Sequence, residues 1–181
     1  MTPDDLRGLG TQELHEHLVT GEPVDTDALA ERVFHGTSLG LPRLLERLTW
    51  TTFIKAFHRD PELGELRGWN VRTVQPGWTP QVRRGAERSF GHFLVRPASE
   101  SPAGSLAPQG LVLDYGAFYA PWQPLGRMRD PLVTLPDSNG LLLGTTLVAL
   151  GSKFATPAYF CLAPGPALEV PVPAPRMRAK R

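Results

Sequence analysis

The sequence contains only one cysteine, Cys161, and it lies inside an apolar run. A disulfide within the chain and a thiolate metal cluster are therefore both excluded. A lone cysteine between apolar neighbours is typical of a small buried side chain, so we expect Cys161 to belong to the core rather than to act as a reactive thiol.

Excess charge of one sign and long hydrophobic segments are also absent. Nineteen basic and eighteen acidic residues leave a formal net charge of +1, so no overall field draws the protein to nucleic acid or to anionic lipid. The apolar stretch 141–150 is interrupted by a glycine and two threonines and is too short to span a bilayer. Residues 1–18 carry scattered charges and lack the apolar segment of a signal peptide, which predicts a cytoplasmic location.

The chain does contain enough apolar material for a core, together with many turn residues. Hydrophobic residues make up 41% of its 181 positions, a length and composition that suit one folded domain. Nineteen prolines and eighteen glycines favour short elements joined by many turns over long helices.

The N-terminal region, residues 1–49, is predicted to be helical. Thr11 is a suitable N-cap for a helix that Gly21 ends. A second short helix is expected over 25–32, and a third begins at Pro42, a residue that fits the first helical turn. Each helix is too short to be stable alone, so we expect all three to pack on the rest of the chain.

From residue 50 onward the period changes to an alternation of the kind that strands show. β-Branched and aromatic residues dominate 50–57, and a turn over 58–64 followed by a strand over 66–74 predicts a hairpin. Asn139 and Gly140, a pair that accepts positive φ, mark the turn of the clearest hairpin. Further strands are predicted over 89–95, 110–118, 132–135, 141–150 and 158–163.

Helices followed by about seven strands with hairpin connections predict an α+β fold, in which short N-terminal helices pack on an antiparallel β-sheet that closes into a small barrel. We expect one domain over 1–163, with the barrel formed by 50–163. The segment 97–108 is rich in proline, serine and alanine and is predicted to be a mobile loop. The proline-rich basic segment 164–181 is predicted to be a disordered tail.

Two short sequence motifs match those of known enzymes, but the elements and residues around them do not fit these enzymes. Residues 36–40 (GTSLG) match the nucleophile elbow of hydrolases, which needs a strand before the serine, whereas 25–32 is predicted helical. The triad of such hydrolases runs serine, acid, histidine; neither Asp114 nor Asp130 is followed by a histidine, and only Asp60 followed by His92 keeps this order. Residues 58–60 (HRD) match the catalytic loop of protein kinases, but the other kinase motifs are missing.

The five histidines do not form a metal site that can be recognised from their spacing. His35, His58 and His92 lie on separate predicted elements and would converge only through the fold. We therefore predict no metal and no cofactor.

Aromatic and polar side chains concentrate on the predicted strands. In a small barrel one face of each strand points inward, and a few polar groups among apolar ones can orient a ligand. We predict non-enzymatic binding of a small apolar or amphipathic molecule inside the barrel, with Lys55 or Arg72 orienting a carboxylate. The predicted ligand-binding residues are Trp50, Lys55, Trp69, Arg72, His92 and Tyr115.

Three other interpretations stay open. The aromatic side chains would simply fill the core if no cavity exists. A small hydrolase would use Ser38, or acid–base chemistry through His58, His92 and Asp114. An interaction module would bind a protein partner through the sheet surface and the basic tail 164–181.

Several stretches of the sequence share features with one known family. Two of them are Gly36 and Gly40 with Ser38 between them, and the run 44–50 (LLERLTW) followed by Lys55. Together they resemble the GXWXG-type family of small bacterial proteins of unknown function, with Ser38 in the place of the family's tryptophan. The resemblance implies a β-rich, lipocalin-like fold with ligand binding, and it brings no catalytic residues. Later stretches of the same likeness are 111–115, 129–130, 141–144 and 157–160.

Overall fold

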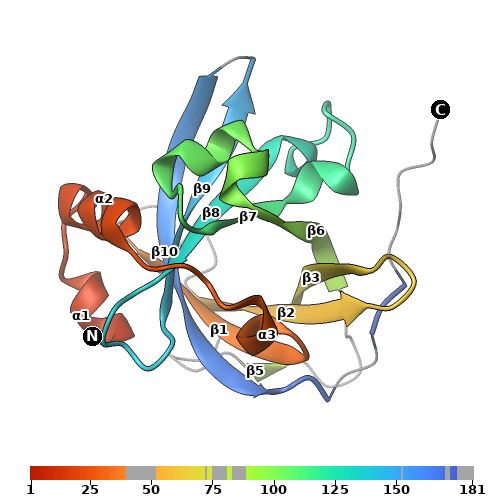
Figure 1. Ribbon diagram of the computed structural model, residues 1–181, viewed down its shortest axis with the longest axis horizontal. Coiled ribbons are helices and arrows are strands. Elements are labelled where there is room, and N and C mark those ends of the chain that lie inside the picture. The colour runs from red at the N-terminus through yellow and green to blue at the C-terminus, as the bar shows by residue number, and fades with distance from the viewer. Residues whose placement is uncertain are drawn as a thin grey trace.

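Eight antiparallel strands close into a barrel in the computed structural model of the chain (Figure 1). The barrel strands are β1 (Arg32–Leu39), β2 (Thr52–Asp60), β3 (Glu65–Val71), β6 (Ser89–Pro97), β7 (Leu111–Asp114), β8 (Met128–Thr134), β9 (Leu142–Leu150) and β10 (Lys153–Ala167). They follow the order β1-β10-β9-β8-β7-β6-β3-β2, and β1 pairs with β10 and with β2 to complete the circle. The predicted α+β fold with an antiparallel barrel is confirmed. The structure describes residues 1–39, 52–71, 73–74, 81–82, 89–151, 153–169 and 172–174.

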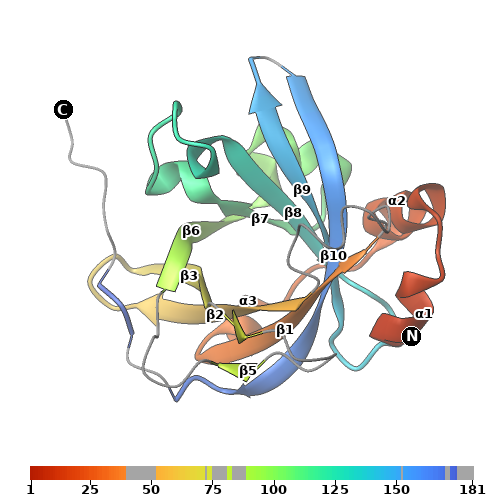
Figure 2. The same cartoon turned by 180° about the vertical axis from the view of Figure 1, so that it is seen from behind.

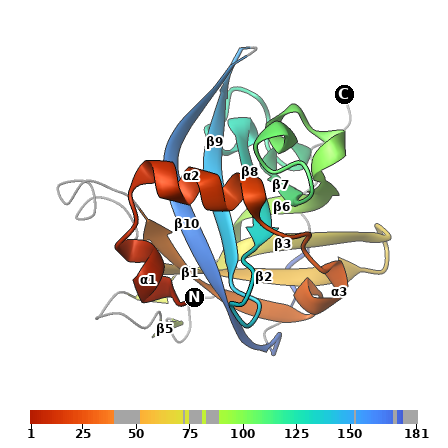
Figure 3. The ribbon, with the colours of Figure 1, turned by 60° about the vertical axis from the view of Figure 1, so that its left-hand side comes forward.

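Short helices surround the barrel, and a small ribbon extends from it. The predicted helix that ends before Gly21 is confirmed, although Gly10 rather than Thr11 is its N-cap, and it crosses the outer face of β8, β9 and β10 (Figure 3). Its Leu14 and Leu18 pack with Val133 and Cys161 in one buried cluster, so Cys161 is a core residue as expected. The helices are α1 (Pro3–Arg7), α2 (Thr11–Thr20) and α3 (Thr26–Leu29), the 3-10 helices are η1 (Ala98–Glu100), η2 (Pro102–Leu106), η3 (Tyr115–Ala117) and η4 (Leu125–Arg127), and the ribbon pairs β4 (Thr73–Val74) with β5 (Gln81–Val82).

Side chains alternate between the interior and the outer face along each strand, as the pleat requires. On β2, Phe57 belongs to the interior cluster, whereas Ile54 and Ala56 pack outside with Trp69 of β3. Leu29 of α3 also joins the interior cluster. The interior cluster therefore fills part of the barrel with apolar side chains.

The region predicted to be helical up to residue 49 contains the first barrel strand. Helix α3 covers only Thr26–Leu29, and Glu31 takes a positive φ of 56° just before β1 begins. Phe34 and Thr37, aromatic and β-branched, lie on this strand and fit its extended backbone. The prediction of helix over 25–32 is therefore wrong in its second half. The helix predicted from Pro42 lies outside the described residues.

The segment 97–108 is not a mobile loop, because it folds into η1 and η2. Ala98 and Ala103 are buried, and the amide of Ala107 donates to the carbonyl of Gly104. The strand predicted over 110–118 ends at Asp114, whose carboxylate accepts a hydrogen bond from the amide of Gly116 and starts η3. Local side-chain capping ends this strand early.

The barrel extends into the segment that the sequence assigns to a disordered tail. Strand β10 continues to Ala167, and the amide of Leu168 donates to the carbonyl of Glu31 at 2.8 Å. Farther on, the carbonyl of Pro173 accepts a hydrogen bond from Arg67, and this stretch lies beside the β2–β3 hairpin (Figure 2). The boundary predicted after residue 163 is therefore too early. Among the described helices, none has both the length and the apolar character that crossing a membrane requires.

Candidate functional site

A cavity of about 320 Å³ lies inside the barrel, on one side of the interior cluster. Most of its lining is aromatic or aliphatic, with Phe53, Phe90, Met128 and Phe160 among the contributors. Several of these side chains are half-buried, so the cavity reaches solvent. Aromatic side chains therefore fill part of the core, as the alternative interpretation expected, but they leave a cavity beside it.

Four polar side chains meet on the cavity wall. Lys55 of β2 and Asn70 of β3 are direct cross-strand partners. Asp130 lies on β8, and Tyr115 follows β7, the strand that pairs with β8. All four line the cavity, and we call them the polar tetrad.

Hydrogen bonds connect the tetrad into one network. Lys55 Nζ donates to Asn70 Oδ1 at 3.0 Å and to the hydroxyl of Tyr115 at 2.6 Å. The Tyr115 hydroxyl donates in turn to Asp130 Oδ2 at 3.0 Å, and Lys55 Nζ lies 3.6 Å from the same oxygen. Asn70 is fixed by a bond from its Nδ2 to the carbonyl of Gly91. The network therefore holds the Lys55 ammonium among three oxygen acceptors.

Burial acts on the charges of the tetrad in opposite ways. It lowers the pKa of Lys55, although the nearby Asp130 carboxylate works against this shift. It raises the pKa of Asp130, with Lys55 and Tyr115 opposing. Burial, reinforced by the charge of Asp130, also raises the pKa of Tyr115 well above 10.0, so this phenol stays protonated. Desolvation favours neutral Lys55 and Asp130, while their mutual attraction favours the ion pair.

Four aromatic rings surround Lys55 Nζ, with centroids 5.4, 5.1, 5.3 and 5.5 Å away for Phe53, Phe93, Tyr115 and Phe160. Each of the three phenylalanines faces a glycine on the neighbouring strand, where a Cβ atom would overlap with the ring. Because these glycines have no side chain, the rings lie against the wall and converge on Lys55. The cross-strand pairs are Gly36–Phe53, Gly68–Phe93 and Gly144–Phe160.

A bulge in β6 decides which side chains of that strand point inward. The register with β3 shifts so that Gly68 faces Phe93 but Asn70 faces Phe90, and Gly91 takes a positive φ of 58°. The extra residue in the bulge lets both Phe90 and Phe93 reach the interior. It also turns His92 to the outer face.

The predicted ligand contacts separate into three groups. Lys55 and Tyr115 meet in the cavity, but Trp69 and His92 lie on the outer face of the wall, with ring centroids 6.3 Å apart. His92 packs against Phe118 as well. The prediction that Trp69 and His92 contact the ligand does not fit this placement. The other two predicted contacts, Trp50 and Arg72, lie outside the described residues.

Asn70 and Asp130 were not predicted as site residues. Asp130 follows two arginines in the sequence, a pattern typical of an exposed start of a strand, yet its side chain is only 1% exposed. Its neighbour Arg129 points elsewhere, and its Nε pairs with Asp114 Oδ1 at 3.0 Å. In the sequence, only the alternation of side chains along β8 indicates that Asp130 and Arg129 point to opposite faces of the strand.

Ser38 lies within strand β1 and lines the cavity, so it does not occupy the turn after a strand that a nucleophile elbow requires. Of the residues considered for acid–base chemistry, His58 Nδ1 lies 2.9 Å from Glu31 Oε1 and Asp114 pairs with Arg129. The described lining of the cavity includes neither of them, nor His92. No group of three or more histidine, cysteine or acidic side chains in the described residues is placed to hold a metal.

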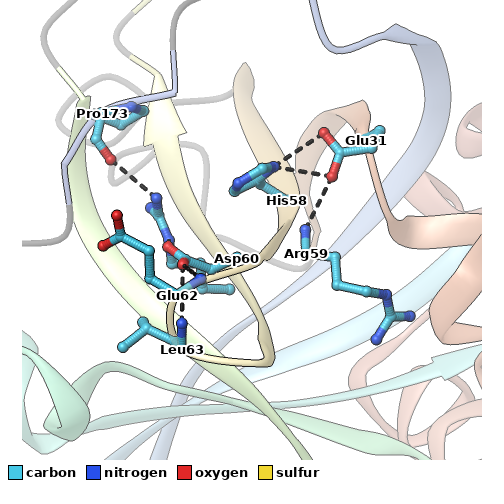
Figure 4. A network of polar contacts seen from close by, with 8 residues as sticks. Glu31, His58, Arg59, Asp60, Glu62, Leu63 and Pro173 are labelled. Carbon is cyan, nitrogen blue, oxygen red and sulfur yellow. Dashed lines mark hydrogen bonds and ion pairs between the residues drawn. The ribbon is translucent and has the colours of Figure 1, made fainter.

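Asp60, the aspartate of the HRD triplet, supports the β2–β3 hairpin (Figure 4). Its Oδ1 accepts hydrogen bonds from the amides of Glu62 and Leu63 at 2.9 and 3.1 Å. Its Oδ2 accepts one from Arg67 Nε at 2.5 Å, and Arg67 Nη2 donates to the carbonyl of Pro173 at 3.1 Å. This network fixes a turn and attaches the C-terminal segment to the barrel.

Comparison of the chain with protein-family models, curated proteins and solved structures found no match. The resemblance to the GXWXG-type family therefore stays a prediction. Only the geometry of the cavity bears on what the protein does.

Proposed function

We propose that the barrel binds a small, largely apolar molecule in the 320 Å³ cavity, without catalysing a reaction. The observation that carries the proposal is an apolar cavity with its polar groups gathered at a single place. Pockets of this kind use apolar surface for affinity and a few polar groups for orientation. Burial of ligand surface contributes about 25 cal/mol per Å² before the costs of binding are subtracted.

The polar end of the ligand is expected to be neutral. Asp130 already balances the charge of Lys55 at 3.6 Å, so a carboxylate would add an uncompensated negative charge to a buried site. Asp130 Oδ1 makes no hydrogen bond within the described part of the chain, although Thr146 is close enough to lower the pKa of this carboxyl. A ligand hydroxyl or N–H group that donates to Oδ1 would satisfy it. This replaces the carboxylate expected from the sequence.

Binding is tested with a neutral fluorescent probe, N-phenyl-1-naphthylamine, and a matched pair of variants on β10. Ala158 lines the cavity, whereas Ala155 on the same strand is exposed. Ala158→Phe is expected to reduce probe affinity by about tenfold by filling the cavity, and Ala155→Phe to leave it unchanged. Equal behaviour of the two variants, or no binding to the unmodified protein, would overturn the proposal.

The polar end is tested by displacement of the probe with two compounds of the same chain length. Nonan-1-ol is expected to displace it at lower concentration than nonanoate at neutral pH. Preference for nonanoate would contradict a neutral head group. Native mass spectrometry of freshly purified protein, followed by denaturing extraction, would then identify any compound that purifies with the chain.

A further inference from the structure

Among the described residues, two ion pairs have both side chains almost fully buried, and they differ in kind. Arg67 Nε lies 2.5 Å from Asp60 Oδ2 on the outer side of the wall, and the hydrogen bonds of Asp60 hold its pKa below 3.8 against the effect of burial. In the cavity, Lys55 and Asp130 are 3.6 Å apart, and burial raises the pKa of Asp130 while it lowers that of Lys55. The contacts of the outer pair favour its charged form, whereas burial of the inner pair favours the neutral form of both partners.

The choice of lysine for the inner pair is notable in this chain, which has sixteen arginines and only three lysines, Lys55, Lys153 and Lys180. An arginine cannot lose its proton in a protein, whereas a buried lysine can become a neutral amine. A neutral amine is a nucleophile toward carbonyl carbon. The residue type at position 55 therefore permits chemistry that the outer pair does not.

We propose that Lys55 holds an apolar aldehyde or ketone covalently, as an imine, with the rest of the ligand in the apolar cavity. This inference rests on the proposed function and names the class of its ligand. The tetrad supplies the groups that the step requires, because Lys55 lines the cavity and the neighbours of its amine can accept and return protons.

The step balances within the tetrad and its ligand. Lys55 first transfers a proton to Asp130, and the amine nitrogen then forms a bond to the carbonyl carbon as the C=O π electrons move to oxygen. A proton passes from the nitrogen to this oxygen, with the Tyr115 hydroxyl as relay, and gives a carbinolamine. Asp130 returns its proton to the carbinolamine hydroxyl, the C–O bond breaks, and water leaves. The product is a protonated imine beside the Asp130 carboxylate, so the net charge is unchanged.

The surroundings of Lys55 suit this product as well as the free ammonium. The positive charge stays at Nζ, where Asp130 is its counterion and four aromatic rings lie within 5.5 Å. Ring faces attract cations, most strongly where water is excluded. Although the cavity opens to solvent, Lys55 and Asp130 are almost fully buried, which limits the access of water that would hydrolyse the imine.

The test uses the full chain with nonanal, followed by sodium borohydride, which reduces an imine to a stable secondary amine. Peptide mapping by mass spectrometry then locates the added mass on Lys55, Lys153 or Lys180. We expect Lys55 to be modified about tenfold more than exposed Lys153, and an excess of nonan-1-ol to suppress the modification of Lys55 but not of Lys153. The unmodified sequence serves here, so the result does not depend on a variant that folds.

Two variants extend the test. Lys55→Arg keeps the charge but cannot form an imine, and Lys153→Arg removes an exposed lysine as the matched control. Modification that follows exposure, with Lys153 ahead of Lys55, would overturn the inference. If nonan-1-ol still displaces the fluorescent probe in that case, the proposed binding function stands and only the covalent step fails. If neither compound enters the cavity, both fail.

Discussion

The Lys55–Asp130 pair holds two charges in a site that water barely reaches. Removing water from both groups costs free energy, and their attraction and hydrogen bonds offset this cost only while both partners are present. Lys55 is 3% and Asp130 1% exposed. The loss of one partner therefore leaves a group that neither solvent nor protein can compensate.

A double-mutant cycle measures this coupling. Lys55→Met and Asp130→Leu are each expected to lower the free energy of unfolding by about 3–5 kcal/mol, because each leaves one buried charge alone. The double variant replaces both charges with apolar groups and should lose much less than the sum of the single variants. Urea unfolding at neutral pH gives the three values. Additive losses would mean that the two side chains do not interact.

The outer pair predicts a pH dependence of definite sign. Burial would raise the pKa of Asp60, but hydrogen bonds from Arg67, Leu63 and Glu62 outweigh it and bring the pKa below 3.8. The stability that Asp60 contributes is thus present above pH 3.8 and is lost as the pH falls through the lower, folded-state pKa. Asp60→Asn should be less stable than the unmodified protein at neutral pH, with a difference that shrinks in acid.

For Asp130 we expect a pH dependence of stability with the opposite sign, so this residue serves as the control. Its pKa is raised above 3.8, so its contribution is complete below pH 3.8 and declines as the pH rises through the folded-state pKa. Urea unfolding of Asp60→Asn and Asp130→Asn at several pH values from neutral to acid compares the two. Parallel pH profiles would show that the two carboxylates have the same environment, against the geometry described above.

Pairs of strands, rather than single residues, build the wall around Lys55. In each of three neighbouring strand pairs a glycine faces a phenylalanine, and the ring covers the place where a side chain would stand. The three rings belong to different strands and still reach the same ammonium group. The glycines are therefore as much a part of the site as the rings that lie over them.

Gly68→Ala tests this arrangement. The added methyl group would overlap with the ring of Phe93 and with the carbonyl of Ala56, and overpacking of this kind costs about 1–3 kcal/mol. We expect lower stability and weaker binding of the fluorescent probe, since the ring must leave its place beside Lys55. Gly8→Ala is the matched control, because Gly8 has an ordinary helical φ of −78° and an added Cβ would meet only the carbonyl oxygen of Asp5, at an ordinary contact distance of 3.5 Å. If the two variants lose stability equally, the ring contact does not matter.

The glycine–phenylalanine pairs also explain which strands could be predicted from the sequence and which could not. Strand β2 is recognisable because its inward positions carry large residues, and the β8–β9 hairpin because of Asn139 and Gly140. Strand β1 has Gly36 and Ser38 at inward positions, opposite Phe53 and Phe160. Small residues opposite large rings pack well in the wall of the barrel. In the sequence alone, however, a run of small residues such as this one is typical of a turn.

The site was predictable only in part for a related reason. Lys55 follows from alternation on β2, a strand that the sequence identifies, whereas Tyr115 comes directly after β7, in η3. The bulge at Gly91 adds one residue to β6, and the His92 side chain therefore points to the outer face instead of the interior. The local sequence pattern does not predict this bulge. Alternation also could not tell which face of β3 points inward, and Asn70, rather than the predicted contact Trp69, lines the cavity.

Closure of the barrel depends on strands that lie far apart in the chain. Arg32 of β1 faces Ala167 of β10, and Leu39 faces Tyr159. Without β10, which pairs with both of them, β1 and β9 would become exposed edges. The outer apolar cluster would lose Cys161 and Tyr159. Helices α1 and α2, which pack on this cluster, would then lose part of the surface that they contact.

Removal of β10 should therefore abolish the fold rather than trim it. A chain that ends at Gly151 is expected to show no cooperative unfolding transition in urea, because the non-local contacts that repay the entropy of closing long loops are gone. A chain that ends at Ala174 keeps every described contact and should unfold cooperatively, with a midpoint close to that of the full chain. Circular dichroism follows both transitions. A cooperative transition in the shorter chain would mean that the remaining strands hold a core of their own, and the cavity would then be a feature added to a stable sheet instead of a consequence of closure.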